Sequence, residues 1–370
     1  DRMHRTRRMV GANEKGLLQD VGGDGPVRIC VGGLMLNQLG WAALLGASVG
    51  MFGRQADDEA GRLLRAAMRR QGLETQLDLS GSASSVAEIF IDAEGERAIY
   101  MAAGATAETR PEHVREDHAE FIGRAARLST EVSQLPLDTT LAALETAHAA
   151  GLSTVVDLDV LPSDAVQALG DRATLEAVLR EADLLKPTAT AARELFPEEA
   201  SAEALVRRIR ERYAATTVVM TDGARGALVS DAAGERWIPA YSAEDVVDST
   251  GAGDAFLGGL LAGEALGLAF DDAVRLGNAC GAACVEQVGA FPEAVDALRD
   301  RVRALYDGPE PSDARWSALP AGASETPGAA GRRVLEVAAR ELSALAERHD
   351  GVSLQAAAEL IEAAEARGGR

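Results

Sequence analysis

The sequence contains few aromatic residues, few cysteines and no long apolar run. Phe, Trp and Tyr make up 4% of the 370 residues, so Ala, Leu and Val must supply most of the core packing. No run of about 18 apolar residues is present and no charged-then-apolar leader opens the chain, so neither a membrane span nor a secretory signal is indicated. The chain begins at Asp1 rather than Met, which is consistent with an N-terminal truncation or a fragment.

The three cysteines, Cys30, Cys280 and Cys284, are an odd number and show no metal-ligand pairing with histidine. Cys280 and Cys284 are four residues apart and share one face of a predicted helix, so we expect two small buried hydrophobes rather than a redox pair. A reducing cytoplasm fits this cysteine usage best.

Acidic residues outnumber basic residues, and the formal net charge is −21. Such a surface repels nucleic acids and anionic membranes unless a local basic patch offsets it. The one cluster of this kind is Arg5 to Arg8, so we expect no nucleic-acid partner and no membrane partner. An acidic surface mainly favours solubility.

The order of apolar patterns predicts an α/β fold. A chain of this length with 47% hydrophobic residues can bury a full α/β core. Short β-branched runs alternate with amphipathic helical patterns, which builds a central, mostly parallel sheet with helices on both faces. The predicted strands are 27–31, 48–52, 153–157 and 216–220, and the predicted helices are 59–71, 141–150 and 202–213.

A different pattern interrupts this alternation between residues 80 and 102. The runs 86–92 and 97–101 flank Ala93-Glu94-Gly95-Glu96, which is a hairpin signal. We therefore expect a small antiparallel sheet that projects from the main body.

The most informative motif is Asp248-Ser249-Thr250-Gly251-Ala252-Gly253-Asp254, which runs into a buried helical pattern. Glycines at a helix N-terminus present free N–H groups and the positive end of the helix dipole to an anion such as phosphate. Asp254, directly after this anion hole, is placed to take the proton of an attacking hydroxyl. The pattern predicts a small-molecule kinase, whereas a plain helix cap with a first-turn acid is the alternative.

This string resembles the C-terminal signature of the ribokinase/PfkB family of carbohydrate kinases. Further matches follow in the family's order over roughly residues 27 to 305. They are Gly32-Gly33-Leu34-Met35-Leu36-Asn37, Leu45-Gly46-Ala47, Gly53-Arg54, Asp57 to Gly61, Thr221 to Gly226 and Asn278 to Ala290. The resemblance implies a ribokinase-like fold and ATP-dependent phosphorylation of a sugar or sugar-phosphate hydroxyl.

The resemblance also assigns roles around the phosphates and the nucleotide. Gly251, Ala252 and Gly253 supply backbone N–H groups to the transferred phosphoryl group, Asp254 is the general base, and Mg²⁺ bridges the phosphates of ATP. On the nucleotide side the resemblance implies the turn with Thr221, Gly223 and Gly226, together with Asn278 on the helix that closes over adenine.

On the sugar side, the resemblance implies binding by Gly32, Gly33, Asn37 and Asp254. Asn37 is also a candidate helix cap, and Asp57 and Asp58 fit a solvated turn equally well. Asp248 and the backbone near Thr250 match positions that hold a monovalent cation, here K⁺, in some family members. Carbonyls near Cys284, Gln287 and Gly289 would complete that shell, although Glu293 stands where a small hydroxyl residue can be a ligand.

Two departures from the family pattern bear on catalysis. Asn and Glu, three residues apart after a Lys-Pro strand end, usually organise metal and phosphate through water, but Lys186-Pro187 is followed here by Thr188 and Ala191. Glu194 is a candidate substitute. The family's sugar-binding Asp after its first strand has no counterpart in Met9 to Gly16, where Asn13 or Glu14 could take its place.

These departures leave alternative functions open. A degenerate kinase that senses a sugar without turnover is one, and a nucleoside kinase is another within the same class. A dinucleotide-dependent oxidoreductase is disfavoured because its glycine motif should follow the first strand and contain a third glycine where Phe256 stands.

The C-terminal part has another composition. We assign residues 1–308 to the kinase domain, 309–331 to a Pro-, Gly-, Ala- and Ser-rich linker, and 332–370 to a helical segment. Its helical patterns, 332–348 and 353–364, resemble the start of a sugar-isomerase (SIS) domain, which would make the chain part of a fusion protein. In the resembled family a small antiparallel sheet such as the one predicted within about residues 80–102 is a lid over the sugar, and this lid can also form a homodimer contact.

Overall fold

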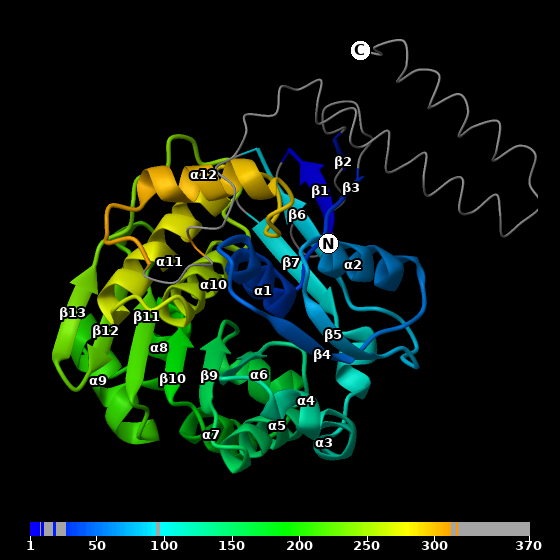
Figure 1. The fold of residues 1–370 in the computed structure, drawn as a ribbon, viewed down its shortest axis with the longest axis horizontal. Helices are drawn as coiled ribbons and strands as arrows, with labels where there is room; N and C mark the ends of the chain where they lie inside the picture. The colour runs from blue at the N-terminus through cyan, green and yellow to red at the C-terminus, as the bar shows by residue number, and fades with distance from the viewer. Residues whose placement is uncertain (8, 11–17, 20–26, 94–96, 312–315, 317–370) are drawn as a thin grey trace, which may run out of the picture. The chain divides into compact units, whose positions relative to one another are not determined.

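A computed structural model describes residues 1–7, 9–10, 18–19, 27–93, 97–311 and 316 (Figure 1). Two compact units divide the chain, Asp1–Leu319 and Pro320–Arg370. The predicted helices at 332–348 and 353–364, most of the predicted linker, and Asn13 and Glu14 lie outside the described residues. The fold described below is that of the first unit.

The centre of this unit is a six-stranded sheet in the order β13-β12-β11-β10-β9-β8. The four strands β8 to β11 run parallel, and β12 and β13 continue the sheet antiparallel. The strands are β8 Arg127–Val132, β9 Ser153–Leu158, β10 Leu184–Pro187, β11 Thr217–Thr221, β12 Ala227–Asp231 and β13 Gly234–Ile238.

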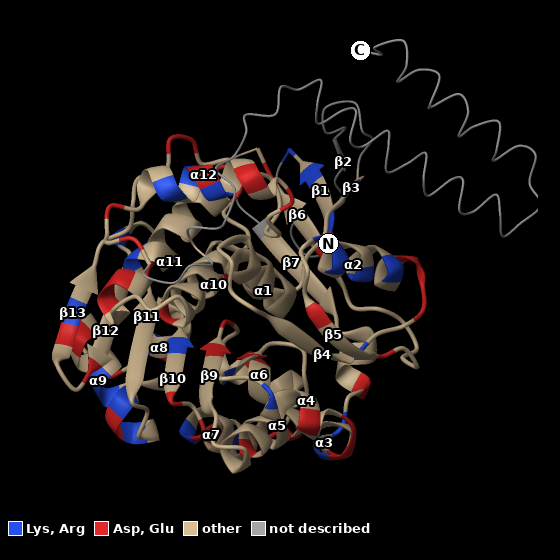
Figure 2. Ribbon diagram, viewed as in Figure 1, with Lys and Arg blue, Asp and Glu red and all other residues tan. Residues whose placement is uncertain are grey.

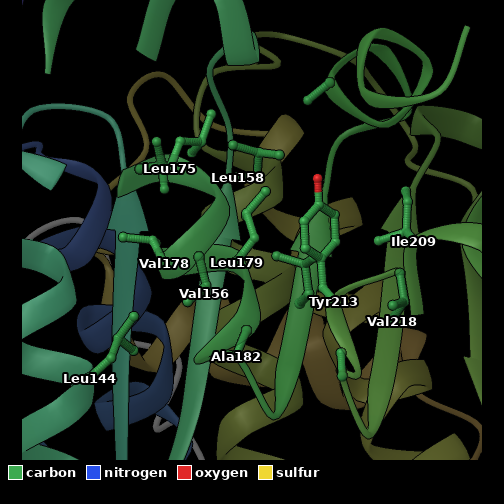
Figure 3. Packing of buried hydrophobic residues seen from close by; sticks show 14 of the residues in the cluster. Leu144, Val156, Leu158, Leu175, Val178, Leu179, Ala182, Ile209, Tyr213 and Val218 are labelled. Atoms are coloured by element: carbon green, nitrogen blue, oxygen red, sulfur yellow. The ribbon is translucent and has the colours of Figure 1, made fainter. Parts of the chain in front are cut away.

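Both faces of this sheet are buried because its parallel strands are apolar at consecutive positions. Val156 and Val218 point into one cluster, and their neighbours Val155 and Val219 point into the cluster on the opposite face. Figure 3 shows the first cluster, in which Leu144, Leu175 and Tyr213 cover the strands. The helices of this layer are α5 Leu137–Ala149, α6 Pro162–Ala168, α7 Arg172–Arg180, α8 Ala189–Leu195 and α9 Ala202–Tyr213.

The opposite face is covered by α10 Ala252–Ala265 and α11 Phe270–Val285. These two helices pack closely because small residues meet at their contact. A Cβ at Gly259 would lie 2.9 Å from the Gly277 Cα. Helices α1 Leu34–Leu44 and α12 Val295–Leu305 join them through a cluster around Trp41. Cys280 and Cys284 are fully buried there as free thiols, which confirms the expectation for this pair.

The lid is an antiparallel hairpin extended by the N-terminal residues. Strands β6 Val86–Ile91 and β7 Arg97–Ala102 pair antiparallel, as predicted. On the other side of β6 lies β1 Arg2–Thr6, which runs parallel to β6 and antiparallel to β2 Leu18–Gln19 and β3 Val27–Ile29. One face of the β6–β7 hairpin, formed by Ala87, Ile89, Ile99 and Met101, lines the large cavity described below.

Two predicted strands are real but pair differently from the prediction. Val27–Ile29 belongs to the lid rather than to the parallel sheet, and β4 Gly50–Arg54 forms a separate two-stranded parallel sheet with β5 Glu74–Asp78. The β-branched runs indicate strands, but nothing within a short run encodes its partner. Helix α2 Glu59–Arg70 connects β4 to β5, and the short helices η1 Gly104–Glu108, α3 Pro111–His113, η2 Val114–His118 and α4 Ala119–Gly123 lead from the lid into β8.

Candidate active site

The predicted anion hole lies at the N-terminus of α10. Gly251 is the N-cap residue with φ of 76°, in the left-handed region. A Cβ there would lie 2.1 Å from the Ala290 Cβ, so the turn excludes any larger residue. The first N–H groups of a helix lack acceptors within the helix. Ala252 N makes one long contact, 3.4 Å to Ser249 O. The N-terminus is therefore open to an anion.

Asp254 lies in the first turn of α10 and is 6% exposed. Its Oδ2 accepts a 2.8 Å hydrogen bond from Asn37 Nδ2 on α1. Asn37 therefore does not cap α1, whose N-cap residue is Gly33. It lies within the helix, and its side chain binds a carboxylate that is distant in the sequence. Burial raises the Asp254 pKa to about 7, although the Asn37 hydrogen bond opposes the rise. A carboxyl with this pKa can accept a proton near neutral pH.

A buried ion pair lies beneath the anion hole. Lys186 Nζ donates to both carboxylate oxygens of Asp157, at 2.9 and 3.0 Å, and Gln38 Nε2 donates to Asp157 Oδ2 at 3.0 Å. A Cβ on Gly253 would lie 3.2 Å from Lys186 Nζ, so the ammonium is directly next to the loop. In Figure 2 an acidic segment of β9 (red) lies on the strand next to a basic segment of β10 (blue).

The ionisation of this pair follows from its surroundings. Burial raises the Asp157 pKa to about 6, and Lys186 opposes the rise. Burial lowers the pKa of Lys186, but Asp157, Asp159 and Asp254 outweigh it and hold the pKa above the ordinary value. Both groups are therefore charged at neutral pH, and Lys186 adds positive potential below the anion hole.

On the sugar side, the structure brings Asp1 to the Gly32-Gly33 turn. A Cβ on Gly32 would lie 2.0 Å from Asp1 Oδ2, so the carboxylate lies directly against this glycine. Asp1 N donates to Cys30 O at 2.9 Å, and Cys30 N donates to Asp1 O at 3.0 Å. The sequence analysis considered candidates for a sugar-binding acid only among residues 9 to 16 and did not consider Asp1.

The anion hole, Asp254, Asn37 and Asp1 line one cavity of about 1630 Å³. Its lining includes the predicted residues Gly32, Gly33, Asn37, Thr250 and Gly251 to Asp254, and the unpredicted Asp1, Gln38, Glu131 and Asp159. The cavity is large enough for a drug-sized ligand. The chemistry-bearing side chains come from α1, α10 and the carboxyl ends of β8 and β9, which is where open α/β sheets bind ligands.

The predicted nucleotide residues lie further along the same sheet edge. Thr221 ends β11 and forms a bridge with Thr188, and Gly223 opens the short helix η3 Gly223–Arg225. Gly226 has φ of 94°. Asn278 donates both amide hydrogens to Ile238 O and Pro239 O, at 3.1 and 3.0 Å, so it joins α11 to the end of β13. Nucleotide binding by these four residues stays a prediction.

The predicted cation loop is held by Asp248. Its Oδ1 accepts from Thr250 N at 2.9 Å and its Oδ2 from Gly289 N at 3.0 Å. Gln287 Nε2 donates to Gly289 O at 3.1 Å, so a cation bound to that carbonyl would displace the amide. Across the described chain, no three His, Cys, Asp or Glu side chains converge on a metal position.

The positions of the missing Asn/Glu pair are occupied by structural residues. Thr188 is the N-cap of α8, with its Oγ1 3.2 Å from Ala191 N, and Ala191 is fully buried. Glu194, the candidate substitute, accepts a 2.7 Å hydrogen bond from Ser163 N. It therefore caps the start of α6 through Oε1.

The family model described as pfkB family carbohydrate kinase matches residues 19–296. This chain belongs to that family. The kinase therefore transfers a phosphoryl group from ATP to a sugar hydroxyl. It is 31% identical to a fructokinase from Klebsiella pneumoniae over 73% of this chain and 90% of the relative, and 28% identical to a ribokinase from Haemophilus influenzae over 71% and 83%.

Solved structures of the same fold agree. The kinase superposes on a ribokinase from Thermotoga maritima with a TM-score of 0.67 at 20% identity, over 83% of this chain and 96% of the other. A Burkholderia thailandensis nucleoside kinase in complex with inosine gives a TM-score of 0.66 at 24% identity, over 82% and 94%. The fold is ribokinase-like. None of the described helices is long and apolar enough to cross a membrane.

Proposed function

We propose that Asp254 is the general base of this kinase and that the N-terminus of α10 is its anion hole. The observation that carries the proposal is a buried carboxyl with a raised pKa in the same helical turn as the open N–H groups. Asp254 takes the proton of the sugar hydroxyl while the hydroxyl oxygen bonds to the γ-phosphorus. The bond between that phosphorus and its bridging oxygen breaks, and ADP leaves.

Positive charge around the transferred group comes from the protein and from metal. Gly251, Ala252 and Gly253 present their N–H groups, and Lys186 adds an ammonium beneath them. Mg²⁺, when bound, neutralises charge on the phosphates. The nucleotide lies along the edge with Thr221, Gly223, Gly226 and Asn278, and K⁺ binds the Asp248–Thr250 loop.

The substrate is a free sugar or a sugar phosphate, held at one end by Asp1 and the Gly32-Gly33 turn and at the other by Asn37 and Asp254. Carboxylate and amide groups that converge on one cavity suit the hydroxyls of a polyol. The lid closes over this end. Nucleoside kinases are also among its relatives, including a cytidine kinase from Thermococcus kodakarensis, 37% identical over 28% of this chain, so a nucleoside is the second candidate.

The test is ATP consumption by the full chain with Mg²⁺ and K⁺ across sugars, sugar phosphates and nucleosides. We expect turnover with one substrate class and a loss of about 10²- to 10⁴-fold in Asp254→Asn. The matched control is Asp245→Asn, an exposed acid, which should retain activity. Sugar binding without turnover in the unaltered chain would overturn the kinase proposal in favour of a sugar sensor.

A further inference from the structure

The active-site cavity is lined by the acidic residues Glu131, at the end of β8, Asp159 and Asp254. Burial raises the pKa of Glu131 well above its ordinary value, and the nearby charges of Asp254, Asp157 and Asp159 add to the rise, whereas Lys186 opposes it. These acidic groups oppose the entry of phosphate groups. A nucleotide therefore reaches this part of the cavity only with additional cations.

Three buried oxygen atoms in this cavity have no donor among the described residues. They are Glu131 Oε2, Asn37 Oδ1 and Gln38 Oε1. Glu131 is 9% exposed, Asn37 4% and Gln38 1%. Buried acceptors without partners cost free energy, so each of the three indicates a missing donor or cation. All three belong to residues that line the cavity.

The position of Glu131 is set by the sheet. It pairs in register with Asp157 on the neighbouring parallel strand, so both carboxylates leave the sheet at the same edge. Asp157 is already neutralised by Lys186 and Gln38. Asp159, two residues on, is exposed and lines the cavity. Glu131 and Asp159 therefore remain as oxygen ligands.

We propose that Glu131 and Asp159 hold the Mg²⁺ of the bound nucleotide, largely through its water shell, in place of the absent Asn/Glu pair at Thr188 and Ala191. This inference rests on the proposed kinase function. Mg²⁺ keeps several waters and is usually bound by one or two carboxylates plus substrate phosphates. Its waters would donate to Glu131 Oε2. Since no three acidic or imidazole groups of the described chain converge, the phosphates must complete the shell.

The test uses Mn²⁺ as a paramagnetic substitute for Mg²⁺, with the full chain and saturating ADP. Electron paramagnetic resonance counts the bound Mn²⁺ in Glu131→Gln, in Asp159→Asn and in the control Glu59→Gln. Glu59 is an exposed acid that lines the same cavity from α2. We expect Mn²⁺ affinity in the ADP complex to fall about 10- to 100-fold in each of the first two variants and to stay unchanged in the control.

A separate titration with metal-free ADP distinguishes metal binding from a packing role. Affinity for metal-free ADP should not fall in Glu131→Gln, because that variant loses a metal ligand and an acidic group that opposes phosphate, and no contact to the nucleotide. Unchanged Mn²⁺ affinity in both variants would overturn the inference, even if sugar-dependent turnover establishes the kinase. If Glu131→Gln does not fold, the exposed Asp159→Asn decides alone. Absence of turnover in a protein that binds Mn²⁺ through Glu131 would instead contradict the kinase function.

Discussion

Asp254 combines two properties that normally oppose each other, because a buried carboxyl is hard to ionise and yet a general base must be ionised. The Asn37 hydrogen bond and the nearby Lys186 ammonium both favour the ionised form, and burial with Asp157 nearby disfavours it. The resulting pKa of about 7 matches the operating range of a base near neutral pH. This balance has consequences for both rate and stability.

The rate should follow the ionisation of Asp254. We expect kcat/KM at subsaturating ATP, which reports the free enzyme, to fall as the pH decreases through about 7 and to level off above it. The measurement is a pH profile between about 5 and 9 with the preferred sugar. A profile that stays flat down to pH 5 would show that a different group is the base.

The free energy of unfolding should show the opposite pH dependence to the rate, because the ionisation of Asp254 lowers it. The pKa of Asp254 is raised in the folded protein, so its contribution to stability is complete below the unfolded value of 3.8 and is lost as the pH rises through about 7. Asp254→Asn removes the free-energy cost of holding an ionised carboxylate in the folded protein. At pH 8 we expect the variant to have a free energy of unfolding about 1–3 kcal/mol larger than that of the unaltered protein, and a higher Tm. At pH 5 the difference should be smaller.

The control for this comparison is Asp245→Asn, whose acid is exposed, and which should leave the Tm nearly unchanged at both pH values. A Tm of Asp254→Asn below that of the unaltered protein at pH 8 would mean that the carboxylate is stabilised by contacts beyond those described here.

At the scale of elements, a single carboxylate joins α2 to the base of the lid. Asp58 is the N-cap of α2 and accepts from Gly61 N at 2.7 Å, Ser84 N at 2.8 Å and Ser84 Oγ at 2.7 Å. These hydrogen bonds, from Ser84 first and then Gly61, lower the Asp58 pKa to about 2. Asp58 is thus a structural residue rather than a solvated turn acid.

Asp58→Ala should destabilise the protein by about 1–2 kcal/mol, since it removes a helix cap and the hydrogen bonds to Ser84. Because the folded pKa is lowered, the effect should be full above about pH 4 and should shrink as the pH falls toward 2. Urea unfolding measures it. The neighbouring Asp57→Ala, whose side chain is 67% exposed, should cost less than about 0.5 kcal/mol. Equal losses in both variants would contradict the capping role.

Sequence patterns found elements better than pairings. The helix predicted at 202–213 has these bounds in the structure, and the lid hairpin was found from its alternation and its turn. Strand β8 was missed, because Arg127, Ser129 and Glu131 make it look polar. The sheet partners of β3 and β4 were also wrong, because pairing depends on residues distant in the chain.

The residues of the candidate site also fall into two groups, those that local sequence motifs predict and those that depend on the fold. Asp254 and Asn37 could be found from local motifs, since a glycine turn before a helix is visible in the sequence. Asp1, Glu131 and the Lys186–Asp157 pair could not, because each acquires its environment only from the fold. Burial turns Glu131 from an ordinary strand residue into an unpaired acceptor, and no spacing rule indicates that.

At the scale of the whole molecule, the lid carries exposed apolar side chains. Tyr100 on β7 is 68% exposed and Ile29 on β3 is 66% exposed. β7 is also an edge strand of its sheet. Exposed apolar residues beside an unpaired edge favour association with another chain. We therefore propose that the kinase forms a homodimer through its lid.

Light scattering coupled to size exclusion tests this contact. We expect a dimer at micromolar concentration and a monomer for Tyr100→Asp, because an ionised side chain at the contact would be buried without a partner. The matched control is Val246→Asp, at an apolar residue 74% exposed outside the lid, which should leave the mass unchanged. A monomeric unaltered protein would refute the lid contact.

Helix α1 is fastened to the C-terminal helices by three hydrogen bonds across very long stretches of chain. Asn37 reaches Asp254 across 217 residues, Trp41 reaches Ala290 across 249, and Arg299 reaches Leu44 across 255. Closing loops of this size costs entropy before any contact repays it, so such contacts form late and slowly. The general base is thus completed only when both ends of the domain have docked. During refolding, enzyme activity should therefore return after most of the secondary structure has formed. The recovery of activity thus reports the rate of the last step of folding.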